Sequence, residues 1–151
     1  ARWKMNPPIR STEDRAALIE GIKDGTIDMI ATDHAPHSVE EKSRGLKDSA
    51  MGIVGLETAF AALNTHLVKR GIISLEHLIK IMSINPRKVF RIAGGLNIGD
   101  RADIVLLDTE KQWRVDSNNF YSMGKITMFD GRDMTGDIAM TIHRGNVVYK
   151  A

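Results

Sequence analysis

Ile27-Asp28-Met29-Ile30-Ala31-Thr32, followed directly by Asp33-His34-Ala35-Pro36-His37, is the stretch from which we infer the fold class. Its first half is short and mainly apolar, which is typical of a parallel strand buried on both faces. Its second half is polar and contains a proline, so the strand should end at Asp33. Because α/β folds build their active sites at the C-terminal ends of parallel strands, the stretch predicts an α/β fold with a site at Asp33.

The segments around this strand alternate between helix and loop. Residues 1–5 are interpreted as the end of another strand, because Pro7-Pro8 stops both helix and sheet. Thr12 is the expected N-cap of a helix over residues 12–24, which has an acidic first turn and an apolar face. Residues 38–51 have no sustained period and are predicted to form a long loop.

Three further helices are predicted after the loop. Residues 52–69 carry apolar side chains at helical spacing. Ser74 is the expected cap of a second helix, and Asn85-Pro86 is interpreted as a cap and first-turn proline that begin a third helix through Ile92.

The apolar period then changes from helical to strand-like. Residues 102–108 and 113–115 are expected to form two strands, and residues 138–149 a hairpin that turns at Arg144-Gly145-Asn146. The order of elements therefore predicts an α/β part that is followed by a small β domain.

Composition excludes several classes of protein. The 151 residues include 21 Lys and Arg against 19 Asp and Glu, a net charge of +2 without a basic cluster, which argues against nucleic acid as a partner. There is no cysteine, so any metal must be bound by histidine and carboxylate. No apolar run approaches the roughly 20 residues that span a bilayer, and we expect a cytoplasmic protein.

Each candidate site residue has a functional and a structural interpretation. Asp33 is either catalytic or a turn residue that accepts hydrogen bonds from backbone amides. His34 and His37 have the spacing of metal ligands, but a pair without a third ligand more often makes ordinary hydrogen bonds. Asn6 is either a turn residue or a reader of a substrate amide, and the glycines near residue 52 could offer backbone N–H groups to an anion. We interpret the remaining histidines as structural: His66, His77 and His143.

Taken together, several stretches resemble the class I dihydroorotases of the amidohydrolase superfamily. They occur in that family's order and cover nearly the whole chain. The matching stretches are Lys4-Met5-Asn6-Pro7-Pro8-Ile9-Arg10, Ile30-Ala31-Thr32-Asp33-His34-Ala35-Pro36-His37, Glu40-Glu41-Lys42, Gly52-Ile53-Val54-Gly55-Leu56-Glu57-Thr58-Ala59, Asn85-Pro86 and Gly99-Asp100-Arg101-Ala102-Asp103-Ile104-Val105.

The resemblance implies a fold. Residues 1–95 would be the last βα units and following helices of a distorted (β/α)8 barrel, and residues 96–151 part of a small β-sandwich-type domain. A complete barrel needs about 250 residues, so the chain would hold an incomplete one. The chain begins with Ala1 rather than Met, and we expect it to be the C-terminal portion of a longer protein.

The resemblance also implies residue roles. Asp33 would contact zinc and shuttle the proton in the interconversion of N-carbamoyl-L-aspartate and (S)-dihydroorotate, a step of pyrimidine biosynthesis. Asn6 would contact the pyrimidine ring and His37 the substrate carboxylate. Backbone groups near Met51 and Gly52 would contact the ring.

The other zinc ligands of that family lie upstream of the stretches found here. We therefore expect the isolated chain to be inactive, and to associate with the missing N-terminal portion or with copies of itself. Aspartate carbamoyltransferase is a further partner that the resemblance suggests. Two alternatives remain open, a hydantoinase or allantoinase and an inactive dihydroorotase-like assembly partner.

Overall fold

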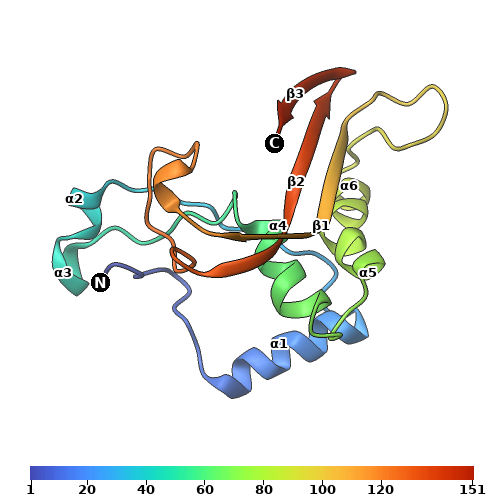
Figure 1. Cartoon of the computed structure of the whole chain (residues 1–151). Coiled ribbons are helices and arrows are strands. Elements are labelled where there is room, and N and C mark those ends of the chain that lie inside the picture. The colour runs from blue at the N-terminus through green and yellow to red at the C-terminus, as the bar shows by residue number, and fades with distance from the viewer. The chain divides into compact units, whose positions relative to one another are not determined.

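A computed structural model describes all residues, 1–151, and contains six α-helices and three strands (Figure 1). The helices are α1 (Thr12–Asp24), α2 (Val39–Lys42), α3 (Gly45–Asp48), α4 (Ala59–Leu63), α5 (Leu75–Ile79) and α6 (Asn85–Val89), with π-helical turns η1 (Asn64–Val68) and η2 (Lys80–Ile84) and a 3-10 turn η3 (Ser117–Asn119). The strands are β1 (Ile104–Arg114), β2 (Asp133–His143) and β3 (Asn146–Lys150). None of the helices is both long and apolar enough to span a membrane.

The chain divides into two compact units. The first comprises residues 1–59 and 113–134, and the second residues 60–112 and 135–151. This division follows contacts between residues, whereas the expected boundary near residue 95 concerns the order of domains in a complete protein and stays a prediction.

Helix α1 of the first unit confirms the helix predicted over residues 12–24, but its cap is Ser11 rather than Thr12. The Ser11 hydroxyl accepts the N–H of Asp14, and the Asp14 carboxylate accepts the N–H of Ser11, so two end groups are satisfied at once. Gly25, with φ 85°, ends the helix in a left-handed conformation.

The two strands predicted in the first unit are absent. Residues 1–5 contain a turn, and residues 27–32 have no ladder partner in this chain. The N–H of Ile27 donates to the Gly21 carbonyl at 2.7 Å instead. A strand needs a neighbouring strand for its hydrogen bonds, and the apolar pattern alone could not reveal whether the chain provides one.

The predicted loop over residues 38–51 contains the short helices α2 and α3. Ser38 and Glu41 form a capping box at the start of α2. The signal was readable in the sequence, because Ser and Glu three residues apart are typical of a helix start.

Helices of the second unit begin and end differently from prediction. Helix α4 begins at Ala59, not at residue 52, and continues into η1. Ser74 caps α5 as predicted, its hydroxyl accepting the N–H of His77 at 3.1 Å. The expected break at Asn85 is wrong, because α5 continues through η2 into α6 and Asn85 is itself helical. Pro86 is the second residue of α6 and directly follows the π-helical turn η2 and Asn85.

One sheet with strand order β1-β2-β3 contains the predicted hairpin. Strands β2 and β3 are antiparallel, and Arg144 and Gly145 form the turn with φ 51° and 81°, as a tight hairpin requires. The two strands expected over residues 102–108 and 113–115 are the single strand β1. The structure is therefore a small α/β piece with one three-stranded sheet.

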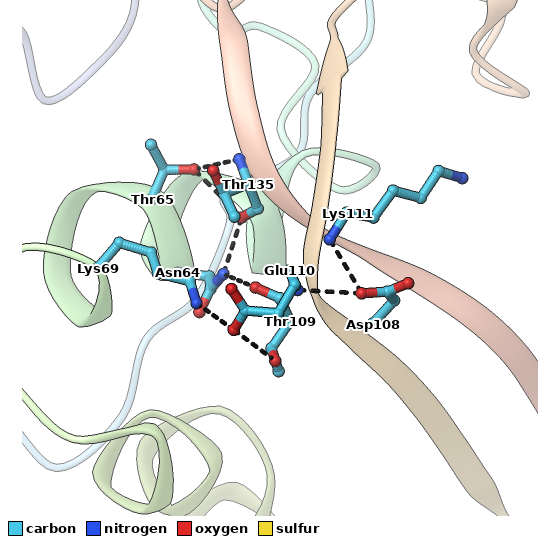
Figure 2. Close-up of polar contacts among 8 residues, drawn as sticks. All are labelled: Asn64, Thr65, Lys69, Asp108, Thr109, Glu110, Lys111 and Thr135. Carbon is cyan, nitrogen blue, oxygen red and sulfur yellow. Dashed lines mark hydrogen bonds and ion pairs between the residues drawn. The ribbon is translucent and has the colours of Figure 1, made fainter.

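Asn64 joins the helical and strand parts of the second unit (Figure 2). It is fully buried, and its side-chain amide donates to the carbonyls of Thr109 in β1 and Thr135 in β2, at 3.1 and 2.8 Å. Thr65 adds a hydrogen bond to each backbone group of Thr135. Apolar side chains around this link form the core of the unit: Phe60, Ala61, Leu67, Ile73, Leu78 and Ile81.

Candidate functional site

The candidate site lies in the first unit, where residues 32–37 run beside residues 52–55. The N–H of Ala35 donates to the Ile53 carbonyl at 3.1 Å. Gly52 has φ 121°, and a β-carbon there would stand 2.4 Å from the β-carbon of Ala35, so only glycine fits. This close approach places the Asp33-His34-Ala35-Pro36-His37 stretch against the loop that carries Met51 and Gly52.

His34 stabilises this arrangement. Its Nδ1 accepts the N–H groups of Gly55 and Leu56 at 3.3 and 3.2 Å, so the ring proton of the neutral imidazole is on Nε2. The ordinary hydrogen-bonding interpretation of His34 is therefore supported by the geometry.

The environment of Asp33 differs from that of His34. Its backbone adopts a left-handed conformation with φ 46°, and its side chain is exposed and accepts no hydrogen bond from the chain. None of the hydrogen bonds from turn amides that the structural interpretation expected is made to the Asp33 carboxylate. The Asp33 carboxylate is thus available to a ligand, and sparsely populated backbone conformations of this kind cluster at functional sites.

His37 contacts the Met51 loop directly. Its Nε2 lies 2.9 Å from the Met51 carbonyl oxygen, and since a carbonyl only accepts, Nε2 carries a proton. The other ring nitrogen, Nδ1, lies 3.6 Å from the Glu41 carboxylate. His37 therefore links α2 to the loop that holds Met51 and Gly52.

The remaining predicted site residues differ in whether their polar groups form hydrogen bonds within the chain. The Gly52 N–H donates to the Lys4 carbonyl at 3.0 Å, while the Met51 N–H has no partner within the chain. Asn6 is exposed and its side chain makes no hydrogen bond within the chain. The structure thus brings His37, Met51 and Gly52 together, and leaves the side chains of Asn6 and Asp33 without partners.

The sequence did not reveal the role of Lys42. Only 3% of this residue is exposed, and its ammonium donates to the carbonyls of Lys4, Ala50 and Gly52 at 2.8, 2.9 and 2.8 Å. Burial, with a smaller effect of the neighbouring Lys4 charge, lowers the pKa of Lys42. The only sequence signal was its position at the end of a capped helical turn.

Gly124, further along the chain, also packs on the site and was missed, and Glu57 binds the backbone two to three residues before it. A β-carbon at Gly124 would stand 2.8 Å from Pro36 and 2.9 Å from the His37 nitrogen, so this glycine packs directly on the site backbone. Glu57 accepts the N–H groups of Tyr121 and Ser122 at 2.6 and 3.1 Å, and the Ser122 hydroxyl at 2.6 Å.

These residues do not form a metal site by themselves. No group of three or more His, Cys, Asp or Glu side chains lies close enough together to hold a metal ion. A zinc site normally has three or four protein ligands, whereas Asp33 stands alone and His34 binds backbone amides. The residues of this chain therefore do not fit a zinc ion without further ligands.

Comparison with known proteins identifies close relatives. Proteins named dihydroorotase from Fusobacterium nucleatum and Bacillus subtilis are each 54% identical to this chain, over 148 and 149 residues. These matches cover 97% and 98% of the chain but 35% of each relative. The chain thus spans about a third of the length of the curated relatives that it matches.

Solved structures give the same picture of the fold. The L-hydantoinase (dihydropyrimidinase) of Arthrobacter aurescens matches with a TM-score of 0.89 at 38% identity, covering 97% of this chain and 34% of that protein. The dihydropyrimidinase of Brevibacillus agri matches with a TM-score of 0.90 at 25% identity, covering 99% and 34%. The model of the amidohydrolase family itself matches residues 7–148. Because that match extends over nearly the whole length of this chain, the chain belongs to the amidohydrolase family.

Proposed function

We propose that this chain is part of a dihydroorotase, which interconverts N-carbamoyl-L-aspartate and (S)-dihydroorotate in pyrimidine biosynthesis. The observation that carries the proposal is the 54% identity to proteins named dihydroorotase along nearly the whole chain. The exposed, unpartnered carboxylate of Asp33, on the same segment as His37, agrees with it.

Asp33 is the proposed catalytic residue. In ring opening it takes the proton of the attacking water and returns it to the departing amide nitrogen, and in ring closure the same steps run in reverse. General acid-base catalysis by one positioned group typically contributes on the order of 10²- to 10⁴-fold. An exposed carboxylate without internal partners is free to form these hydrogen bonds.

The substrate would be bound by groups that precede and follow Asp33 in the sequence. Asn6 offers an amide that can pair with the ring amide, and Met51 offers a free backbone N–H. The Gly52 N–H is already bound by Lys4, so Gly52 would contribute its carbonyl oxygen, which retains acceptor capacity beside Lys42. His37, whose Nδ1 lies 3.6 Å from the Glu41 carboxylate, would bind the substrate carboxylate.

Zinc belongs to the complete protein in this proposal. Asp33 would be the one ligand from this chain, and residues elsewhere in the longer protein would supply the rest. Similarly, we propose a (β/α)8 barrel to which residues 1–95 contribute, a β domain to which residues 96–151 contribute, and a cytoplasmic location. Partners would be the remainder of the protein, further copies, or aspartate carbamoyltransferase.

A hydantoinase or related cyclic amide hydrolase is the second candidate. The L-hydantoinase of Arthrobacter aurescens, with 38% identity and a TM-score of 0.89, is the observation that favours it. Both candidates open a cyclic amide, so the distinguishing feature is recognition of the substrate carboxylate.

The test compares substrates in the complete protein. Dihydroorotate is the expected substrate, and 5,6-dihydrouracil is a matched control because it lacks only the carboxylate. Sites that bind a polar substrate group can reject the analogue without it by about 10⁴-fold in kcat/KM, which is the expected ratio. A preference for dihydrouracil, hydantoin or allantoin would support the second candidate. Absence of turnover with every substrate would favour an inactive assembly partner.

A further inference from the structure

We propose that Lys42 is a positioning residue, which holds the backbone of Ala50, Met51 and Gly52 in the conformation that binds the substrate. This inference rests on the proposed function, because it assigns a task to the same site. The inference is supported by the burial of Lys42 and by the three carbonyl groups that accept hydrogen bonds from its ammonium.

The surroundings of Lys42 match its hydrogen-bonding capacity. A lysine ammonium has three N–H donors, and the carbonyls of Lys4, Ala50 and Gly52 accept one each. These acceptors come from two segments that lie 38 residues and 8 to 10 residues from Lys42 in the sequence. The side chain thus joins two segments that are distant in the sequence, and it reinforces the hydrogen bond from the Gly52 N–H to the Lys4 carbonyl.

Neighbouring contacts orient Lys42 and strengthen the same loop. Helix α2, which ends at Lys42, is capped by Ser38 and Glu41. The buried Ser49 hydroxyl donates to the Lys42 carbonyl at 3.1 Å, and the N–H of Ala50 donates to the Glu41 carbonyl at 3.0 Å. Lys4 extends the network, since its ammonium donates to the carbonyls of Lys47 and Ser49, each at 2.9 Å.

The groups controlled by Lys42 are those proposed to bind the substrate, and not the reacting carboxylate. Moving the 50–52 backbone would displace the Met51 N–H, the Gly52 carbonyl and, through the Met51 carbonyl, His37. Asp33 lies on a segment that His34 ties to Gly55 and Leu56. Loss of the Lys42 ammonium should therefore weaken substrate binding more than the chemical step.

The experiment uses the complete protein with Lys42→Met, which keeps the length of the side chain but removes its three donors. Misplacement of binding groups by about 1 Å can cost up to 10²-fold, so we expect KM for dihydroorotate to rise roughly 10- to 100-fold. We expect kcat to change by less than about threefold, because the transition-state groups remain in place. Metal content should equal that of the wild type.

Lys47→Met is the matched control, since it removes a nearby exposed lysine ammonium that forms no hydrogen bond or ion pair within the chain, while the Lys47 carbonyl that binds Lys4 stays in place. It should leave both constants unchanged. Hydrogen exchange provides a readout independent of activity: the 50–52 backbone should exchange faster in Lys42→Met than in Lys47→Met.

The outcomes separate this inference from the proposed function. A wild type without dihydroorotase activity contradicts the proposed function, and the exchange measurement then decides the role of Lys42. An active wild type with unchanged KM and exchange in Lys42→Met overturns the inference. A loss of kcat and of bound metal in Lys42→Met at unchanged KM would also overturn the inference. If Lys42→Met does not fold, Lys4→Met replaces it as the test variant. A rise in KM smaller than that expected for Lys42→Met would support the inference, and an unchanged KM would overturn it.

Discussion

Asp33 and His34 are adjacent in the sequence but have opposite roles in the structure. His34 is engaged with two backbone amides, whereas the Asp33 carboxylate has no partner within the chain. The left-handed backbone of Asp33, with φ 46°, directs the two side chains into these different environments. Such strain at an exposed carboxylate favours a functional interpretation.

Substitution of the proposed substrate-binding residues should weaken binding without affecting the metal. A hydrogen bond to a charged group is worth about 1.5–3 kcal/mol, so His37→Ala should raise KM for dihydroorotate roughly 10- to 150-fold in the complete protein. Asn6→Ala removes a neutral hydrogen bond and should have a smaller effect. Steady-state kinetics and metal analysis check both. His143→Ala, outside the site, is the control, and loss of metal from His37→Ala would show that its role is misassigned.

Glu57 should make stability depend on pH at the acidic end. Burial opposes its ionisation, but hydrogen bonds from Ser122 and Tyr121, with the Lys125 charge, lower the pKa of Glu57 below its ordinary value of 4.5. A carboxyl with a lowered folded-state pKa stabilises the protein above its unfolded pKa, and this contribution disappears as the pH falls through the folded pKa.

The wild type should therefore melt at a higher temperature than Glu57→Gln. This difference in melting temperature should be largest near about pH 6 and should shrink toward about pH 3. Calorimetry of the complete protein across this range measures it. A difference that stays constant with pH would mean that the Glu57 charge contributes nothing.

The sequence predicted the candidate residues better than their environments. The resemblance indicated Asp33, Asn6 and His37, because motifs are local in the sequence. The roles of Lys42 and Gly124 were not predicted, since they depend on partners 38 and 87 residues away. No local pattern distinguishes a lysine that binds three buried carbonyls from one on a solvated helix face.

Helices and strands were predictable where the groups that determine them lie close together in the sequence. Helix α1 and the β2–β3 hairpin were predictable, because capping groups and turn residues lie within them. The strand expected over residues 27–32 was not formed, since its hydrogen bonds depend on neighbours elsewhere. Likewise, the continuity of α5 with α6 depends on the π-helical turn η2, which apolar spacing does not encode.

Gly136 in β2 should be essential to the packing of the second unit. It has φ 105°, and a β-carbon there would stand 2.8 Å from the Asn64 amide nitrogen and 2.9 Å from the Phe60 ring. Gly136→Ala therefore combines backbone strain with overpacking, which typically costs a further 1–3 kcal/mol or so. Gly145→Ala is the matched control, because Gly145 has φ 81° and open space around it.

Melting temperatures of the two variants in the complete protein check this prediction. Gly136→Ala should melt below Gly145→Ala, and the difference measures the close contact with Asn64 and Phe60. Equal melting temperatures would mean that the helix moves to accommodate the added methyl group.

The whole chain corresponds to part of the length of its relatives in the amidohydrolase family. It spans about a third of its curated relatives, and it contains no cluster of metal ligands. It also exposes large apolar side chains, such as Phe90 and Leu96, which are 68% and 84% exposed. Exposed apolar surface of this kind commonly marks an interface with other protein.

The isolated 151-residue chain should accordingly bind no stoichiometric zinc, because one carboxylate does not replace three or four ligands. It should also self-associate, or bind the remaining portion of the protein when that is added. Light scattering, metal analysis and a dihydroorotase assay on the purified chain check this. A monodisperse monomer with one zinc and turnover would refute our interpretation of the chain.

We propose that this chain supplies the reacting carboxylate of a dihydroorotase, so Asp33→Ala in the complete protein should lose turnover. The measurement is kcat for dihydroorotate, with circular dichroism and melting temperature to verify the fold. Loss of a general acid-base group predicts a decrease on the order of 10²- to 10⁴-fold in a folded protein. Turnover close to that of the wild type would contradict the claim.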